Sequence, residues 1–165
     1  MKLPKNWLPP EEYFPILPKK RMGTGALFFN REGKVLLVKP TYKDYWSIPG
    51  GSVDENESPR AAAIRETKEE IGFEPRNLRL AAVDYVAVDG IKTESLQFIF
   101  YGGVLTSAEI DRIKVDGEEV DDYCFVSLKR ALKMVSMGVT KKISHWLEGI
   151  KNGGALYLEN GQKAD

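Results

Sequence analysis

The chain has 165 residues and a mass of 18.6 kDa, a size that fits one domain and leaves little room for a second. Hydrophobic residues make up 42% of it and charged residues 29%, a composition typical of a globular protein with a buried core. The 24 lysines and arginines balance the 24 aspartates and glutamates, which argues against a general nucleic-acid-binding or membrane-surface protein, because such proteins need a basic excess.

The single cysteine excludes an internal disulfide and a cysteine-rich zinc site. The first residues contain no apolar run of signal-peptide length, and no later run approaches the roughly eighteen apolar residues of a membrane span. We therefore predict a cytoplasmic protein that contacts neither DNA nor a membrane.

The first twenty residues are rich in proline and aromatic residues. Because proline fixes φ and donates no backbone hydrogen bond, residues 1–20 are predicted to form an extended arm rather than a helix. Trp7, Tyr13 and Phe14 indicate that this arm lies on an apolar surface, which is either its own domain or a second copy of the chain in a homodimer.

Residues 21–155 are predicted to form a single domain in which strands alternate with helices. Unbroken apolar runs such as those at 25–29 and 35–38 are typical of strands that are covered on both faces. Strands are expected at 25–29, 35–38, 46–48, 80–88, 96–104 and 123–126, and helices at 59–71, 128–137 and 140–150. This order predicts an α/β fold with a mixed sheet flanked by helices, followed by a polar, frayed tail at 156–165.

The helix at 59–71 has clear local start and stop signals. Ser58 is a good N-cap, Pro59 suits the first helical position, and Gly72 suits the C-terminal stop. At about 100° per residue, the carboxylates of this helix share the face opposite its isoleucines. They are Glu66, Glu69 and Glu70.

Taken alone, three glutamates on one helix face are most simply a solvated surface. Here, however, a Gly-Gly pair at Gly50 and Gly51 precedes the helix, and such a loop lets backbone approach a ligand closely. Carboxylates beside a glycine loop form a hard-oxygen site suited to Mg²⁺ or Mn²⁺, ions that bind substrate phosphates. The residues alone therefore predict a divalent-metal site for phosphate chemistry.

The same segment, GSVDENESPRAAAIRETKEEIGF at 51–73, resembles the signature of the Nudix hydrolase family, GX5EX7REUXEEXGU, in which U is a bulky apolar residue. All seven fixed residues stand at the required spacing, and the one departure is Thr67 at a U position. The lead-in at 46–51 and the acidic stretch at 119–128 are similar to the family as well. The resemblance implies a Nudix-type α/β/α sandwich with a mixed β-sheet.

It also implies hydrolysis of a diphosphate linked to a nucleoside: a nucleoside triphosphate, an oxidised nucleotide, ADP-ribose or a nucleotide sugar. By position, Glu66, Glu69 and Glu70 would bind Mg²⁺ or Mn²⁺ together with the carbonyl of Gly50, and Glu66 would also activate water. The further catalytic residues that the resemblance implies are Arg65 and Glu57, as an ion pair that orients the helix, and Glu119, as a carboxylate from the late loop.

Two other functions stay open. One is a Nudix-like domain that binds nucleotides as a sensor without turnover, although a pure binding domain has no need for the whole set of glutamates. An RNA-end pyrophosphohydrolase is the other alternative, and the neutral net charge disfavours it because a strand of phosphates favours a basic groove.

Overall fold

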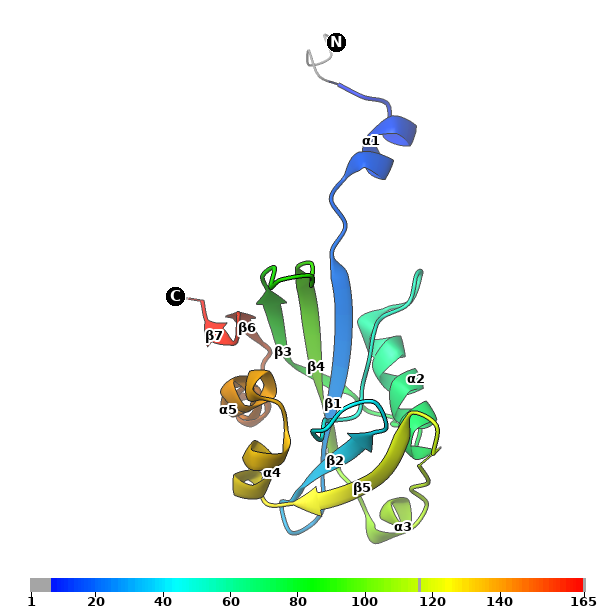
Figure 1. Cartoon of the computed structure of the whole chain (residues 1–165), viewed down its shortest axis with the longest axis vertical. Coiled ribbons are helices and arrows are strands. Elements are labelled where there is room, and N and C mark those ends of the chain that lie inside the picture. The colour runs from blue at the N-terminus through cyan, green and yellow to red at the C-terminus, as the bar shows by residue number, and fades with distance from the viewer. Residues whose placement is uncertain (1–6, 116, 165) are drawn as a thin grey trace.

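The computed structural model describes residues 7–115 and 117–164, which form a mixed sheet between two layers of helices (Figure 1). The strands are β1 (Arg21–Phe29), β2 (Val35–Pro40), β3 (Arg79–Val86), β4 (Ser95–Val104), β5 (Val120–Val126), β6 (Leu156–Glu159) and β7 (Gln162–Lys163). The helices are α1 (Pro10–Ile16), α2 (Pro59–Ile71), α3 (Ser107–Ile110), α4 (Leu128–Met134) and α5 (Met137–Asn152).

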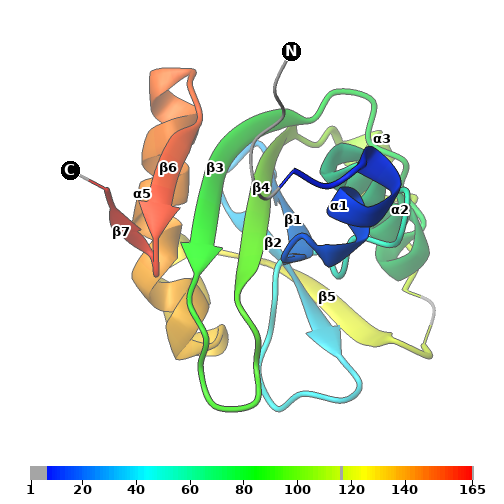
Figure 2. The ribbon, with the colours of Figure 1, turned by 90° about the horizontal axis from the view of Figure 1, so that it is seen from above.

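The sheet has the strand order β5-β2-β1-β4-β3-β6-β7. Its central strand β1 runs parallel to β4 and antiparallel to β2, which confirms the predicted mixed sheet. Viewed from above, α5 covers one face of the sheet while α2 and α3 cover the other (Figure 2). The α/β class predicted from the sequence is therefore confirmed.

Two separate cores explain the unbroken apolar runs of the central strands. Leu27 of β1 and Leu37 of β2 face the core under α4 and α5, whereas their neighbours Phe28 and Leu36 face the core under α2. Successive side chains of a strand point to opposite faces, so a strand covered on both sides must be apolar at every position.

Helix α2 begins and ends where its local signals predict. The Ser58 hydroxyl accepts a hydrogen bond from the Ala61 N–H at 3.1 Å, and Pro59 occupies the first turn. Gly72 closes the helix with φ of 67°, a left-handed conformation that glycine adopts without the penalty of a side chain.

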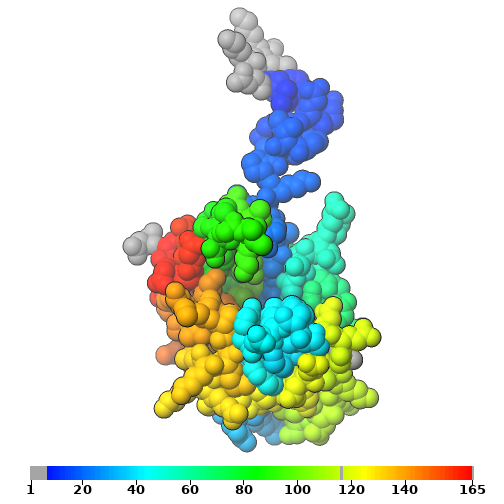
Figure 3. Space-filling view, viewed as in Figure 1, coloured from blue at the N-terminus to red at the C-terminus, as the bar shows by residue number. Residues whose placement is uncertain are grey.

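The prediction that residues 1–20 contain no helix is wrong, because Pro10–Ile16 form the short helix α1. Pro10 stands in its first turn, where a missing N–H costs nothing, and the amide of Tyr13 donates to the Pro9 carbonyl at 2.9 Å. The helix stands clear of the sheet, with the Phe14 side chain 65% exposed (Figures 1 and 3). The described arm thus does not pack on its own domain, and its residues 1–6 lie outside the described part of the chain.

The tail prediction is also wrong. Residues 156–159 form β6, which pairs in parallel with β3, and β7 then pairs with β6. Leu158 is fully buried in the core, so burial of this strand supplies the stability that its short length lacks. Residue 165 lies outside the described part of the chain.

Smaller differences concern the other elements. Residues 46–48 make only isolated bridges to Val38 and Val135 instead of a strand. The helix predicted at 128–137 ends at Met134, and Ser136 caps α5, which therefore begins before residue 140. Helix α3 was not predicted at all. In the described residues, no helix has the length and hydropathy needed to cross a bilayer.

Candidate active site

The guanidinium of Arg65 donates hydrogen bonds to three carboxylates and one backbone carbonyl. Its Nε and Nη2 donate to the two carboxylate oxygens of Glu57, each at 3.0 Å, which is the ion pair implied by the resemblance. Nη1 donates to Glu66 and to Glu69, both at 2.9 Å, and Nη2 also reaches the Ser52 carbonyl at 3.0 Å. The Arg65 hydrogen bonds hold the pKa of Glu57 below its usual range, and they tie α2 to the loop before it.

The three glutamates of α2 differ in exposure. Glu66 and Glu70 are buried, at 9% and 7% exposed, whereas the Glu69 side chain is about half exposed. The simple picture of a solvated carboxylate face is therefore wrong for two of the three residues. They are buried because the loop containing Gly50 and Gly51 lies directly against them.

The glycines are required by this close approach. A Cβ on Gly51 would lie 2.6 Å from the carboxylate oxygens of Glu66, and a Cβ on Gly50 would lie 2.2 Å from the Thr24 carbonyl oxygen. The Gly50 N–H donates to Glu70 at 2.9 Å. Gly50 also has φ of 143°, a conformation that side chains rarely adopt.

Backbone pairing leaves the carbonyl of Gly50 available. The carbonyls of Pro49 and Gly51 accept hydrogen bonds from Ala26 and Thr24 of β1, at 2.9 and 2.8 Å. No N–H of the described residues donates to the carbonyl between them. This oxygen therefore has no donor among the described residues, while the N–H of the same residue contacts the buried carboxylate of Glu70.

Glu119 joins the two buried glutamates from another part of the chain. It immediately precedes β5, and its backbone carbonyl accepts a hydrogen bond from the Thr41 N–H at 2.9 Å. Its charge contributes to raising the pKa values of both Glu66 and Glu70, so these three carboxylates share one electrostatic environment. Sequence position alone placed Glu119 only in a late acidic loop.

Burial, and after it the repulsion between neighbouring carboxylates, shifts the pKa values of Glu66 and Glu70 upward. Burial raises the pKa of Glu70 to about 8, although the Gly50 N–H partly opposes it and the charges of Glu66 and Glu119 add to it. Burial also raises the pKa of Glu66, against the opposing effect of Arg65. Buried carboxylates that repel one another are stabilised in their charged form by a nearby cation.

The donor set suits a hard divalent cation in both charge and ligand type: two buried carboxylates, the nearby Glu119 and an uncommitted carbonyl. Within the described residues, no three acidic, histidine or cysteine side chains lie in an arrangement that could hold a metal ion as they stand. The carboxylates of Glu66 and Glu69 are instead each paired with Arg65 at 2.9 Å.

A cleft of about 590 Å³ extends from Gly50 and Gly51 across the ends of β1 and β4 to α5. Lys43 and Lys142 lie in its wall, and Lys142 forms an ion pair with the buried Asp84 at 2.5 Å. Trp146 lines the same cleft. The volume of this cleft is in the range of pockets that hold nucleotide-sized ligands.

Trp146 is a candidate functional residue that sequence reasoning missed. It is only 3% exposed, and its indole N–H has no hydrogen-bond partner among the described residues. A buried donor without an acceptor is costly, so a ligand acceptor at this position would be favoured. The sequence gives no sign of this role, because a tryptophan on an amphipathic helix is usually a core residue.

A mixed sheet between helical layers, with a glycine loop leading into a glutamate-bearing helix, defines the chain as an α/β/α sandwich with an acidic site at one end of its cleft. The sequence model of the NUDIX domain matches residues 19–147, most of the chain. The chain therefore belongs to the NUDIX family.

An RNA pyrophosphohydrolase from Hydrogenovibrio crunogenus is 45% identical over 60 residues, which are 36% of this chain and 36% of that protein. The match thus spans about a third of the length of that curated relative. Among solved structures, the MutT protein from Methanosarcina mazei Go1 has a TM-score of 0.64 at 21% identity, covering 83% of this chain and 98% of that one. The NUDIX domain of Shewanella oneidensis NrtR, solved with ADP ribose, has a TM-score of 0.68 at 17% identity, covering 87% and 99%.

Proposed function

We propose that the protein is a metal-dependent hydrolase that cleaves the diphosphate linkage of a nucleoside diphosphate derivative by attack of water on phosphorus. The observation that carries the proposal is the group formed by Glu66, Glu70 and Glu119 beside Gly50, where the cleft begins. Family membership and the full set of glutamates support turnover over a sensor that only binds.

In this proposal Glu66, Glu69, Glu70 and the Gly50 carbonyl hold Mg²⁺ or Mn²⁺. The bound ion would neutralise the diphosphate charge and lower the pKa of an attacking water. Glu66 accepts the proton of that water, and Glu119 is the alternative base. Burial raises the pKa of Glu66 in the metal-free protein, and a bound cation would hold its carboxylate in the charged form that accepts a proton.

Arg65 and Glu57 act by positioning. Arg65 restrains Glu66 and Glu69 from the side of the loop, and Glu57 in turn holds Arg65 by two hydrogen bonds. The cleft toward α5 takes the rest of the substrate, where the Trp146 N–H donates to an acceptor of the base or leaving group. The hydrolase domain proposed at 21–155 is completed by the strand at 156–159.

The test is Mg²⁺-dependent release of phosphate, pyrophosphate or nucleoside monophosphate from a panel of nucleoside triphosphates, oxidised nucleotides, ADP-ribose and nucleotide sugars. Glu66→Gln should lower kcat by at least about 10²-fold on the best substrate, because it removes both a base and a charge. Glu55→Gln is the matched control, since Glu55 is an exposed glutamate in the loop that precedes α2. Equal loss in both variants, or turnover of no compound, would count against the proposal.

A second candidate is removal of pyrophosphate from an RNA 5′ end, which the similarity to the RNA pyrophosphohydrolase of Hydrogenovibrio crunogenus favours. The neutral net charge of this chain argues against it. A 5′-triphosphorylated oligoribonucleotide, added to the same panel, separates the candidates. A kcat/KM for RNA well above that for every small nucleotide would make this the function.

A further inference from the structure

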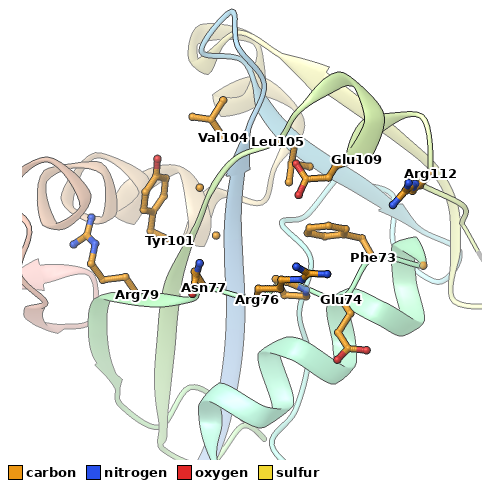
Figure 4. A pocket seen from close by; sticks show the side chains of 14 residues that line it. Phe73, Glu74, Arg76, Asn77, Arg79, Tyr101, Val104, Leu105, Glu109 and Arg112 are labelled. Carbon is orange, nitrogen blue, oxygen red and sulfur yellow. The ribbon is translucent and has the colours of Figure 1, made fainter.

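A second cleft, distinct from the one beside the glutamates, lies between the loop that follows α2 and the end of β4 (Figure 4). It has a volume of about 780 Å³ and is lined by residues of the segments 72–79 and 101–112. It shares no lining residue with the cleft at Gly50. Whatever occupies it is therefore not held by the proposed hydrolytic site.

Three guanidinium groups line this second cleft, those of Arg76, Arg79 and Arg112. In Figure 4, Arg79 lies toward one end of the cleft and Arg112 toward the other, with Arg76 between them. Among residues 7–115 and 117–164, none of the three forms an ion pair, whereas Arg65 contacts four carboxylates. Three guanidinium charges thus face one cleft without a salt-bridged partner.

The two acidic residues of the cleft have other partners. Glu74 forms an ion pair with Lys68 at 2.9 Å. Glu109 accepts hydrogen bonds from the backbone and the hydroxyl of Thr106, at 2.8 and 2.7 Å, in the capping box of α3. These bonds lower the pKa of Glu109, and the nearby charges of Arg76 and Arg112 lower it further. With three arginines against two glutamates, the lining keeps an excess of positive charge.

Among the three arginines, Arg79 gives the most direct reason to expect a bound anion. Its guanidinium lies over the ring of Tyr101, 5.4 Å from the centroid, and its Nη2 donates to the Ile150 carbonyl at 2.7 Å. Its Nη1 is buried and has no hydrogen-bond partner among the described residues. A buried, charged donor left without an acceptor is unfavourable, and an anion bound nearby would offset the charge.

The other residues that line the cleft suit a ligand larger than a bare anion. The Phe73 ring packs edge-on against Phe28 and Tyr101 packs against Phe29, so that both cleft aromatics are held in place. Gly102 passes so close to the Phe28 ring that a Cβ would lie 2.0 Å from it. Arginines beside aromatic rings that are held in place suit a planar base joined to phosphate.

We propose that this second cleft binds the phosphate of a nucleotide, either a free nucleotide or one within an RNA strand. Guanidinium groups offer phosphate paired N–H donors in a geometry that lysine lacks. Cavities of roughly 300–1,000 Å³ accommodate ligands of nucleotide size. The inference stands independently of the proposed hydrolysis, because it uses other residues in another cleft.

The test is titration of the full ¹⁵N-labelled chain with ADP in EDTA, followed through its backbone amides by NMR. We expect the amides of 72–79 and 101–112 to shift, and added salt to weaken the binding. Arg76→Gln combined with Arg112→Gln changes two exposed residues and should weaken binding at this cleft by at least about tenfold. Arg31→Gln combined with Arg130→Gln alters the net charge equally at exposed positions elsewhere and should leave binding unchanged.

Parallel titrations with inorganic phosphate and with a 5′-monophosphorylated oligoribonucleotide identify the source of the ligand. Tighter binding of RNA than of ADP, lost in the Arg76/Arg112 double variant, assigns the cleft to RNA, and equal binding assigns it to free nucleotides. The proposal is overturned if millimolar concentrations of all three leave the amides of 72–79 and 101–112 unshifted, or if both double variants lose binding equally. Hydrolysis by the Arg76/Arg112 double variant should stay at the wild-type rate, so failure here is distinguishable from failure of the proposed function.

Discussion

Replacement of Glu70 by glutamine should stabilise the metal-free protein while abolishing its response to metal. Glu70 is buried and has a pKa of about 8, against an ordinary value of 4.5. The substituted amide keeps an oxygen that can accept the Gly50 N–H, so the hydrogen bond at 2.9 Å survives. What is lost is a carboxyl group whose ionisation is opposed by burial and by the charges of Glu66 and Glu119.

The sign follows from proton linkage. Below pH 4.5 the Glu70 carboxyl is protonated in both the folded and the unfolded chain, and it costs the fold no ionisation free energy. As the pH rises from 4.5 to about 8, the unfolded chain ionises freely while the folded chain holds its proton, so wild-type stability falls. Above that range both states are ionised and the full penalty persists.

At about 1.36 kcal/mol per pKa unit, the penalty at pH 8 is at most roughly 4 kcal/mol. Burial of the substituted amide also has a cost, so we expect Glu70→Gln to be about 2 kcal/mol more stable than wild type at pH 8. Because the cost of burying the amide does not vary with pH, the difference should pass through zero near pH 6 and leave the variant about 1 kcal/mol less stable than wild type at pH 5. Mg²⁺ should then stabilise the wild type and leave the variant almost unchanged.

Urea unfolding in EDTA at pH 5, 6.5 and 8, repeated with Mg²⁺, measures both effects. Glu69→Gln is a suitable control because the Glu69 side chain is half exposed and the variant keeps Glu70, so without metal it should lose stability with rising pH as the wild type does. A variant that is no more stable than wild type at pH 8, or a stability difference that is constant with pH, would refute the reasoning.

Three further predictions concern positioning, substrate contact and the arm. Arg65→Lys should lower kcat by about 10- to 100-fold in steady-state assays, because lysine cannot hold Glu57 with two parallel bonds, and Arg60→Lys should have no such effect. Trp146→Phe should raise KM by roughly tenfold with little change in kcat, because it removes the unpaired indole N–H; an unchanged KM would restrict Trp146 to packing. Deletion of residues 1–18 should reduce the oligomer size measured by sedimentation, or lower the Tm, and should leave turnover intact, since the exposed α1 supplies no group to either cleft.

Local chemistry in the sequence determined helix α2 completely. The Ser58 cap, Pro59 in the first turn and the left-handed Gly72 act within a few residues of the chain, so no tertiary partner is needed to place the ends of the helix. The apolar runs likewise marked β1 and β2, because a segment buried on both faces favours apolar residues at successive positions. The spacing of the glutamates identified the family for the same local reason.

Features that depend on distant partners were decided only by the tertiary structure. The strand at 156–159 has only four residues and lies in an otherwise polar tail, and pairing with β3 together with the burial of Leu158 makes it part of the sheet. Helix α1 is the opposite case, because the proline content of this segment argued against a helix. Pro10 stands in the first turn, where proline is compatible with a helix.

The site itself divides in the same way. The helical period placed Glu66, Glu69 and Glu70 on one face, but only the approach of the Gly50 loop buries two of them and leaves the third half exposed. Glu119 joins them because β5 pairs with β2, a contact between residues far apart in the chain. Burial and mutual repulsion, which set the pKa values of these carboxylates, are properties of neighbours in space, and the linear order of residues does not contain them.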